Sequence, residues 1–195
     1  MAKKNTRNTR SKIVSAAWRL FYEQGYEDTT VEEIIFESGT SKGSFYHYFD
    51  GKDALLTTLS TVFDDKYEEL LPNLTDDMTG MQKLLYLNAE LFALIENTVP
   101  IEILTRLLST QLVTNGEKHL IDKNRTYFKI IRKIVTEARA KGEFTDRMSA
   151  SEMVKLYALA ERALMYDWCL CGGEYSLKTY SQKVLPMFIS GFVKE

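Results

Sequence analysis

The chain has 195 residues, 45% hydrophobic and 27% charged, a balance that excludes a disordered chain and favours a globular protein that folds unaided. Its length suits one compact domain or a small domain joined to a larger one. The formal net charge of −2 hides an asymmetry, because residues 1–24 carry six basic side chains and one acidic one (+5), which leaves −7 for the rest.

Targeting signals and metal ligands are not evident. Every apolar run is interrupted by Asn, Glu, Asp or Arg well before membrane-spanning length, so we expect a cytoplasmic protein. Cys169 and Cys171 lie two residues apart on an expected helix, and their side chains therefore point to different sides. A thiol sensor or soft-metal site is the alternative, but with no third cysteine and no nearby histidine we interpret both as small apolar residues. We expect no metal and no cofactor.

Helical periodicity covers most of the chain, and no segment shows the alternation and hairpin turns of β-structure. The pattern predicts an all-α protein. In chain order the expected helices cover residues 11–24, about two turns after Thr30, residues 42–48, 52–71 and 81–96, a segment after Pro100, and residues 127–138, 149–170 and 177–193.

Local signals place two short helices close together near the N-terminus. Thr30 and Glu33 have the spacing of a capping box, which predicts a helix start. Gly39 can adopt a positive φ at little cost and ends that helix, and Ser41 is an N-cap for the next. Two short helices joined by a glycine turn are typical of a helix-turn-helix unit, whose second helix enters the major groove of DNA.

The segment DTTVEEIIFESGTSKGSFYHYFDGKDALL, residues 28–56, resembles the signature of the TetR family of bacterial transcriptional regulators. A weaker similarity lies in EARAKGEFTDRMSASE, residues 137–152. The resemblance implies an all-helical dimer of about nine helices. It implies a three-helix DNA-binding domain with a basic tail over residues 1–51, and a larger domain over residues 52–195 that binds ligand and dimerises.

The resemblance also implies which residues meet DNA. The base-facing candidates are Lys42, Gly43, Ser44 and His47. The phosphate-side candidates are Thr30, Ser41, Tyr46, Tyr48 and Lys52. The alternative is that the tyrosines pack between helices and that the histidine is only solvated.

Three residues near the glycine turn differ from the family pattern, and the basic N-terminal tail has two interpretations. Ile35, Ser38 and Thr40 depart from the small residue, alanine and valine usual in the family, which bears on how closely the two helices approach. The basic tail from Lys3 to Lys12 is either a disordered end or an arm that reaches phosphates or the minor groove.

In the larger domain, the resemblance implies an inducer cavity, and a lining rich in aromatic side chains would suit a lipophilic or aromatic molecule. For each candidate the alternative is a place in the core. The candidates are Tyr86, Phe92, Arg106, Tyr127, Tyr157, Met165 and Trp168. Glu161 and Arg162 interrupt an apolar helix, and we interpret them as members of a surface or interhelical ion pair. The helices over 149–170 and 177–193 are apolar on more than one face, which indicates a four-helix dimer interface.

These features predict a ligand-responsive DNA-binding regulator, most simply a repressor that a small-molecule inducer releases from a palindromic operator. An enzyme is not expected, since His47 and His119 are the only histidines and no Walker loop, zinc-binding pair or nucleophile elbow occurs. The alternative is a helical small-molecule-binding or protein-interaction module without functional DNA binding.

Overall fold

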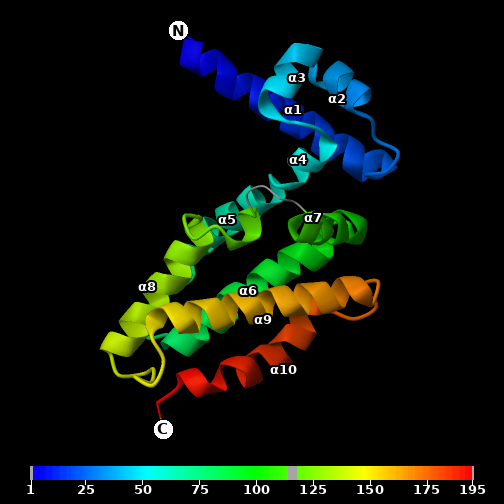
Figure 1. Ribbon diagram of the computed structural model, residues 1–195. Helices are drawn as coiled ribbons and strands as arrows, with labels where there is room; N and C mark the ends of the chain where they lie inside the picture. Colours follow the sequence, from blue (N-terminus) through cyan, green and yellow to red (C-terminus); the bar gives the residue numbers. More distant parts are fainter. Residues whose placement is uncertain (1, 114–117, 195) are drawn as a thin grey trace. The chain divides into compact units, whose positions relative to one another are not determined.

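The computed structural model describes residues 2–113 and 118–194 (Figure 1), and these residues confirm the all-α fold. They form ten α-helices and three short 3-10 helices. The α-helices are α1 (Ala2–Gln24), α2 (Val31–Ser38), α3 (Lys42–Tyr48), α4 (Lys52–Leu56), α5 (Leu59–Leu70), α6 (Gly80–Thr98), α7 (Ile101–Val113), α8 (Thr126–Ala140), α9 (Ala150–Leu170) and α10 (Leu177–Ile189). The 3-10 helices are η1 (Leu71–Asn73), η2 (His119–Ile121) and η3 (Ser190–Phe192).

The described residues fall into two compact units. The N-terminal unit takes in the described part of residues 1–61 and 102–114, so that it includes α7 as well as α1 to α4. The larger unit takes in the described part of residues 62–101 and 115–195. Among the described residues, no helix combines the length and apolar character needed to cross a bilayer.

In the N-terminal unit, α2 and α3 pack on α1 and on each other. The apolar positions of α1 face inward, and Ile13, Ala17 and Phe21 are almost completely buried. Ile34 from α2 and Phe45 from α3 complete this core. A three-helix core therefore forms between the long helix α1 and the two short helices α2 and α3.

One expected helix, over residues 52–71, is divided into α4 and α5 in the structure. Two hydroxyl groups bond to nearby carbonyls at the break: Thr57 Oγ1 donates to Ala54 O (2.7 Å), and Thr58 Oγ1 donates to Leu55 O (2.6 Å). The backbone hydrogen bonds there join residues three apart, as in the bond from Thr58 N to Leu55 O at 3.0 Å. Side chains that bond to nearby carbonyls compete with the α-helical ladder, and the segment tightens into a 3-10 turn.

In the larger unit, α9 and α10 pack together, α10 also lies against α6, and α8 packs on α6 and α9 (Figure 1). Gly80 permits one close approach, because an added Cβ would lie 2.4 Å from Ala138 Cβ of α8. Pro186 lies inside α10, which continues to Ile189 before the chain tightens into η3. This unit therefore has a continuous helical core.

Candidate functional site

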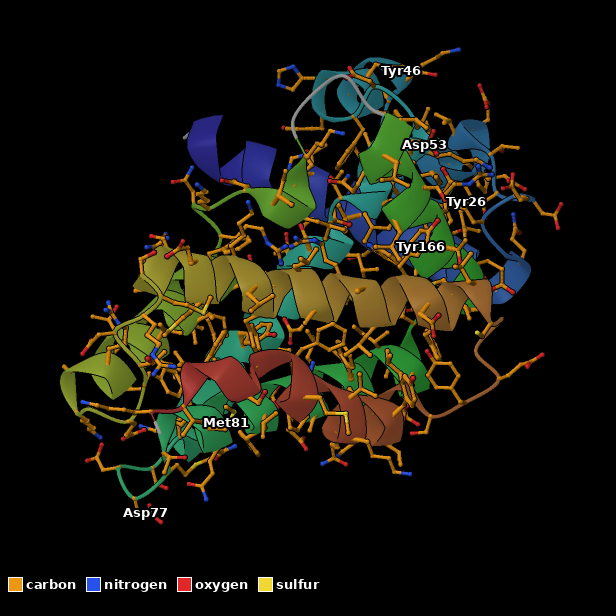
Figure 2. The ribbon with its side chains drawn as sticks, turned by 60° about the horizontal axis from the view of Figure 1, so that its bottom comes forward. Tyr26, Tyr46, Asp53, Asp77, Met81 and Tyr166 are labelled. Carbon is orange, nitrogen blue, oxygen red and sulfur yellow. The ribbon has the colours of Figure 1, made fainter. Side chains whose placement is uncertain are left out.

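The second helix of the helix-turn-helix unit, α3, has one buried face and one open face. Phe45 is completely buried and anchors the helix. On the other side Lys42, Gly43 and His47 are exposed. Tyr46 is exposed as well (Figure 2). The structure thus leaves these predicted DNA contacts accessible in this unit.

The start of α3 is capped by its own hydroxyls. Ser41 Oγ accepts a hydrogen bond from Ser44 N (3.1 Å), and the two hydroxyls lie 2.9 Å apart. Ser44 and Tyr48 are partly buried. Ser41 and Ser44, two of the predicted DNA contacts, are therefore bonded to each other at the start of α3.

The unusual residues of the turn fit without separating α2 from α3. Ser38 Oγ donates to Ile35 O (3.1 Å), and the Ser38 and Thr40 hydroxyls lie 2.8 Å apart. Gly39 adopts φ +61°, and its N–H bonds to carbonyls of the last turn of α2. The hydroxyls that depart from the family pattern are thus bonded within the turn itself.

Thr30 forms the capping box expected from the sequence. Its hydroxyl accepts from Glu33 N (3.2 Å), and Glu33 Oε2 accepts from Thr30 N (2.7 Å). The backbone hydrogen bond from Thr30, followed by that from its hydroxyl, lowers the pKa of Glu33. Thr30 therefore fixes the start of α2.

Lys52 has a different environment from the one its predicted phosphate contact suggests. Its ammonium group donates to the carbonyl oxygens of Tyr26 (2.7 Å), Glu27 (3.0 Å) and Thr29 (2.9 Å). It also lies 4.5 Å from the centre of the Tyr26 ring. Because an ammonium group has three hydrogens, all three are used in holding the connection between α1 and α2.

Tyr26 also contacts one residue of α4 and one of α7. Its hydroxyl donates to Asp53 (Figure 2), and Arg106 lies 5.4 Å from its ring centre and forms an ion pair with Glu27. Burial, reinforced by the hydrogen bond to Asp53, raises the pKa of Tyr26 well above its ordinary value. Arg106, a predicted inducer contact, is thus placed in the N-terminal unit.

The larger unit contains a small cavity of about 30 Å³ between α5, α6, α8, α9 and η2. Apolar side chains such as Phe63, Leu91 and Leu120 form much of its wall. Two arginines, Arg125 and Arg162, and one carboxyl group also line it. The wall thus combines apolar side chains with a few polar groups, the mixture typical of ligand sites, in a space that holds no more than a water molecule or two.

The predicted inducer contacts are divided between this cavity and other places. Tyr127 and Met165 line it. Phe92 and Tyr157 are buried in the core, outside the lining. Trp168 Nε1 donates to Tyr175 O (2.8 Å), and the Tyr86 hydroxyl accepts from Asn73 (3.1 Å).

The carboxyl group in the cavity wall belongs to Glu161, which is only 3% exposed. Its Oε1 accepts from Asn88 Nδ2 (2.9 Å) and, at 3.4 Å, from the Tyr67 hydroxyl. Its Oε2 accepts from the Tyr127 hydroxyl (2.7 Å). Burial raises the pKa of Glu161, and these donors act in the opposite direction. Within the described residues Glu161 thus has neutral donors where the sequence indicated an ion pair.

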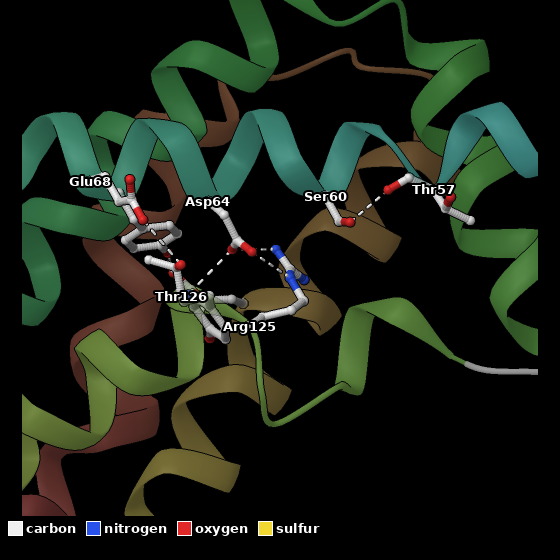
Figure 3. Close-up of polar contacts among 9 residues, drawn as sticks. Thr57, Ser60, Asp64, Glu68, Arg125 and Thr126 are labelled. Carbon is white, nitrogen blue, oxygen red and sulfur yellow. Dashed lines mark hydrogen bonds and ion pairs between the residues drawn. The ribbon is translucent and has the colours of Figure 1, made fainter. Parts of the chain in front are cut away.

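A second polar contact, missed by the sequence reasoning, joins α5 to the start of α8 (Figure 3). Arg125 binds Asp64 through two bonds, Nε to Oδ2 at 3.1 Å and Nη2 to Oδ1 at 2.8 Å. Thr126 Oγ1 donates to Glu68 (3.2 Å), which lies on α5 together with Asp64.

The contact between Asn88 and Glu161 has a partial signal in the sequence. Both polar residues interrupt the apolar positions of a helix, but the spacing of residues does not reveal that they bind each other.

Comparison with known proteins covers both units. Residues 13–59 match the family model of bacterial regulatory proteins of the tetR family, and residues 59–191 match that of the C-terminal region of YsiA-like proteins. The fatty acid metabolism regulator protein of Bacillus subtilis (strain 168) is 23% identical over 184 residues, which cover 92% of this chain and 93% of that protein.

Solved structures show the same fold. A transcriptional regulator FadR from Bacillus subtilis in complex with stearoyl-CoA has a TM-score of 0.69 and 22% identity, and covers 94% of this chain and 99% of its own. Thermus thermophilus FadR, a transcriptional repressor in complex with lauroyl-CoA, has a TM-score of 0.75 and 21% identity. The match covers 95% of this chain and 96% of the Thermus chain.

Proposed function

The chain belongs to the TetR family of bacterial transcriptional regulators, and on that premise we propose that it is a homodimeric repressor released from DNA by a lipophilic small molecule. The observation that carries this proposal is the open face of α3. There Lys42, Tyr46 and His47 are exposed on a short helix whose opposite face is anchored by Phe45. Such a helix can enter a major groove without unfolding its own domain.

The proposed DNA contacts divide by chemistry. Lys42, Gly43, Ser44 and His47 would face bases, while Ser41, Tyr46 and Tyr48 would bind phosphates. Thr30 and Lys52 keep a place among the phosphate-side candidates, but their present hydrogen bonds favour a supporting role.

Dimerisation is supported by apolar side chains that one copy of the chain leaves exposed on α9 and α10. Met187, for example, is 76% exposed. The others are Leu159, Tyr166, Leu170, Tyr180 and Phe188. Pairing these two helices with those of a second copy would form a four-helix interface. A palindromic operator then requires two α3 helices about 34 Å apart, the spacing of its half-sites.

The inducer we propose is a lipophilic molecule of the acyl-CoA type, because the related FadR structures hold stearoyl-CoA and lauroyl-CoA. Phe63, Leu91 and Met165 line the small cavity of the larger unit, which would have to widen to admit an apolar chain. To reduce DNA occupancy from about 99% to about 1%, the inducer must favour the released conformation by about 5.5 kcal/mol.

Selection of bound sites from a random DNA pool tests the proposal directly. The purified full-length protein should enrich a palindrome, bind it with strong salt dependence and release it on addition of lauroyl-CoA. Lys42→Met should weaken binding or relax base preference, whereas Lys129→Met, an exposed lysine of α8, is the matched control. Ligand binding without any salt-dependent affinity for DNA would instead favour a binding module without DNA function.

A further inference from the structure

The three glutamates of α2 have different partners. Glu33 closes the capping box at the start of the helix, and Glu37 forms an ion pair with Arg19 of α1. Both contacts hold α2 in place within the N-terminal unit. Glu32 instead lies 3.9 Å from the ammonium group of Lys42, at the start of α3. Glu32 is thus placed beside a side chain to which the proposed function assigns a base contact.

The surface around this pair is open in the described N-terminal unit. The side chains of Lys42 and Glu32 are 71% and 73% exposed. Phe36 follows Glu32 by one turn on the same side of α2 and is 86% exposed. Because 3.9 Å is little more than the length of one hydrogen bond, a base pair that contacts Lys42 also comes within reach of Glu32.

A carboxylate group beside DNA has few favourable partners. It repels the phosphates, and as an acceptor without a hydrogen of its own it gains only from a hydrogen-bond donor. In the major groove those donors are the amino groups of cytosine and adenine. Lysine pairs with guanine O6 and N7, and a carboxylate pairs with cytosine N4, so the two side chains together favour a G·C pair.

The two bases of one G·C pair present these groups side by side. Guanine offers two acceptors in the major groove, and the amino donor of cytosine lies next to them. Lys42 and Glu32 present a donor beside an acceptor, which is the complementary arrangement. The ammonium group has three hydrogens, so it can bond to guanine and still hold the carboxylate of Glu32.

We propose that Glu32 is a specificity-determining residue, which accepts a hydrogen bond from cytosine N4 of the base pair whose guanine is bound by Lys42. The inference rests on the proposed function. It extends the reading of bases from α3 to the first turn of α2.

The test first locates the base pair. Selection from a random DNA pool with the full-length protein should enrich a palindrome that has a G·C pair at one position of each half-site. Lys42→Met should relax the preference for guanine at that position.

The second step changes the cytosine alone. N4-methylation replaces the amino hydrogen that faces the major groove and leaves the pairing hydrogen in place. In fluorescence anisotropy at fixed salt, the wild type should bind the methylated operator at least about fivefold more weakly than the unmodified one.

In Glu32→Ala the two operators should bind within about twofold of each other, because the acceptor is gone. The side chain is largely exposed, so the change leaves the core intact. Glu174→Ala, at an exposed glutamate between α9 and α10, removes the same charge. This matched control should keep the full sensitivity to methylation.

The outcomes separate the two proposals. If the wild type binds both operators equally, or if no guanine depends on Lys42, the inference is refuted while the proposed function stands. An equal loss on methylation in the wild type and in Glu32→Ala refutes the assignment to Glu32. If the selection enriches no DNA sequence, the proposed function fails, and this inference fails with it.

Discussion

Replacing Lys52 with methionine should lower the free energy of unfolding, because the ammonium group of Lys52 holds three carbonyl oxygens of the connection between α1 and α2. A hydrogen bond to a charged group contributes about 1.5–3 kcal/mol when well buried. Lys52 is half-buried and the freed carbonyls regain water, so we take about 1 kcal/mol for each bond and expect a total loss of about 2–4 kcal/mol. Methionine retains most of the aliphatic stem, so packing on Tyr26 changes little.

Thermal unfolding followed by circular dichroism measures this loss, which corresponds to a decrease in Tm of about 4–16 °C for a chain of this size. A phosphate contact predicts a different result. Losing one would lower the salt dependence of DNA binding by about 0.9 in the logarithmic slope and leave Tm unchanged.

Lys42→Met is the comparison, since the Lys42 side chain is 71% exposed and lies 3.9 Å from Glu32 in a surface ion pair. Such pairs contribute about 0–1 kcal/mol, so its Tm should stay close to that of the wild type while its DNA binding weakens. A Lys52→Met protein with unchanged Tm and a reduced salt slope would refute the bracing role, because the ammonium group would then serve DNA.

Two further predictions concern the larger unit. Gly80→Ala should destabilise the protein by about 1–3 kcal/mol in urea unfolding, because the new Cβ would lie 2.4 Å from Ala138 Cβ and 3.1 Å from Phe144 Cζ. Gly51→Ala, whose Cβ would meet nothing within 4 Å, is its control, and equal losses in both would contradict the steric explanation. Because burial raises the pKa of Glu161 in the folded protein, the stability it contributes is present below its unfolded pKa of about 4.3 and is lost as pH rises through the folded pKa. Glu161→Gln does not titrate there, so its stability relative to the wild type should increase from about pH 4 to pH 7; a constant difference would argue against a raised pKa.

Local rules explain why much of the fold could be predicted. The capping boxes at Thr30 and Ser149 form as expected, since each joins groups only three residues apart. A third box, at Thr79 and Gln82, obeys the same rule and was a missed signal. The division of the expected helix over residues 52–71 also depends on neighbouring residues. The sequence did not reveal it, because Thr57 and Thr58 can occur within a continuous helix as well as at a break.

The sequence by itself determined the helical periods, the turn at Gly39 and an exposed, polar α3, because these depend on residues within one or two turns of each other. Only the tertiary structure decided what the long side chains do. Lys52 bonds to carbonyls 23 to 26 residues away, and Glu161 accepts from tyrosines 34 and 94 residues away. Lysine and glutamate offer the same groups on any surface, and only packing decides whether those groups meet water, DNA or the protein's own backbone.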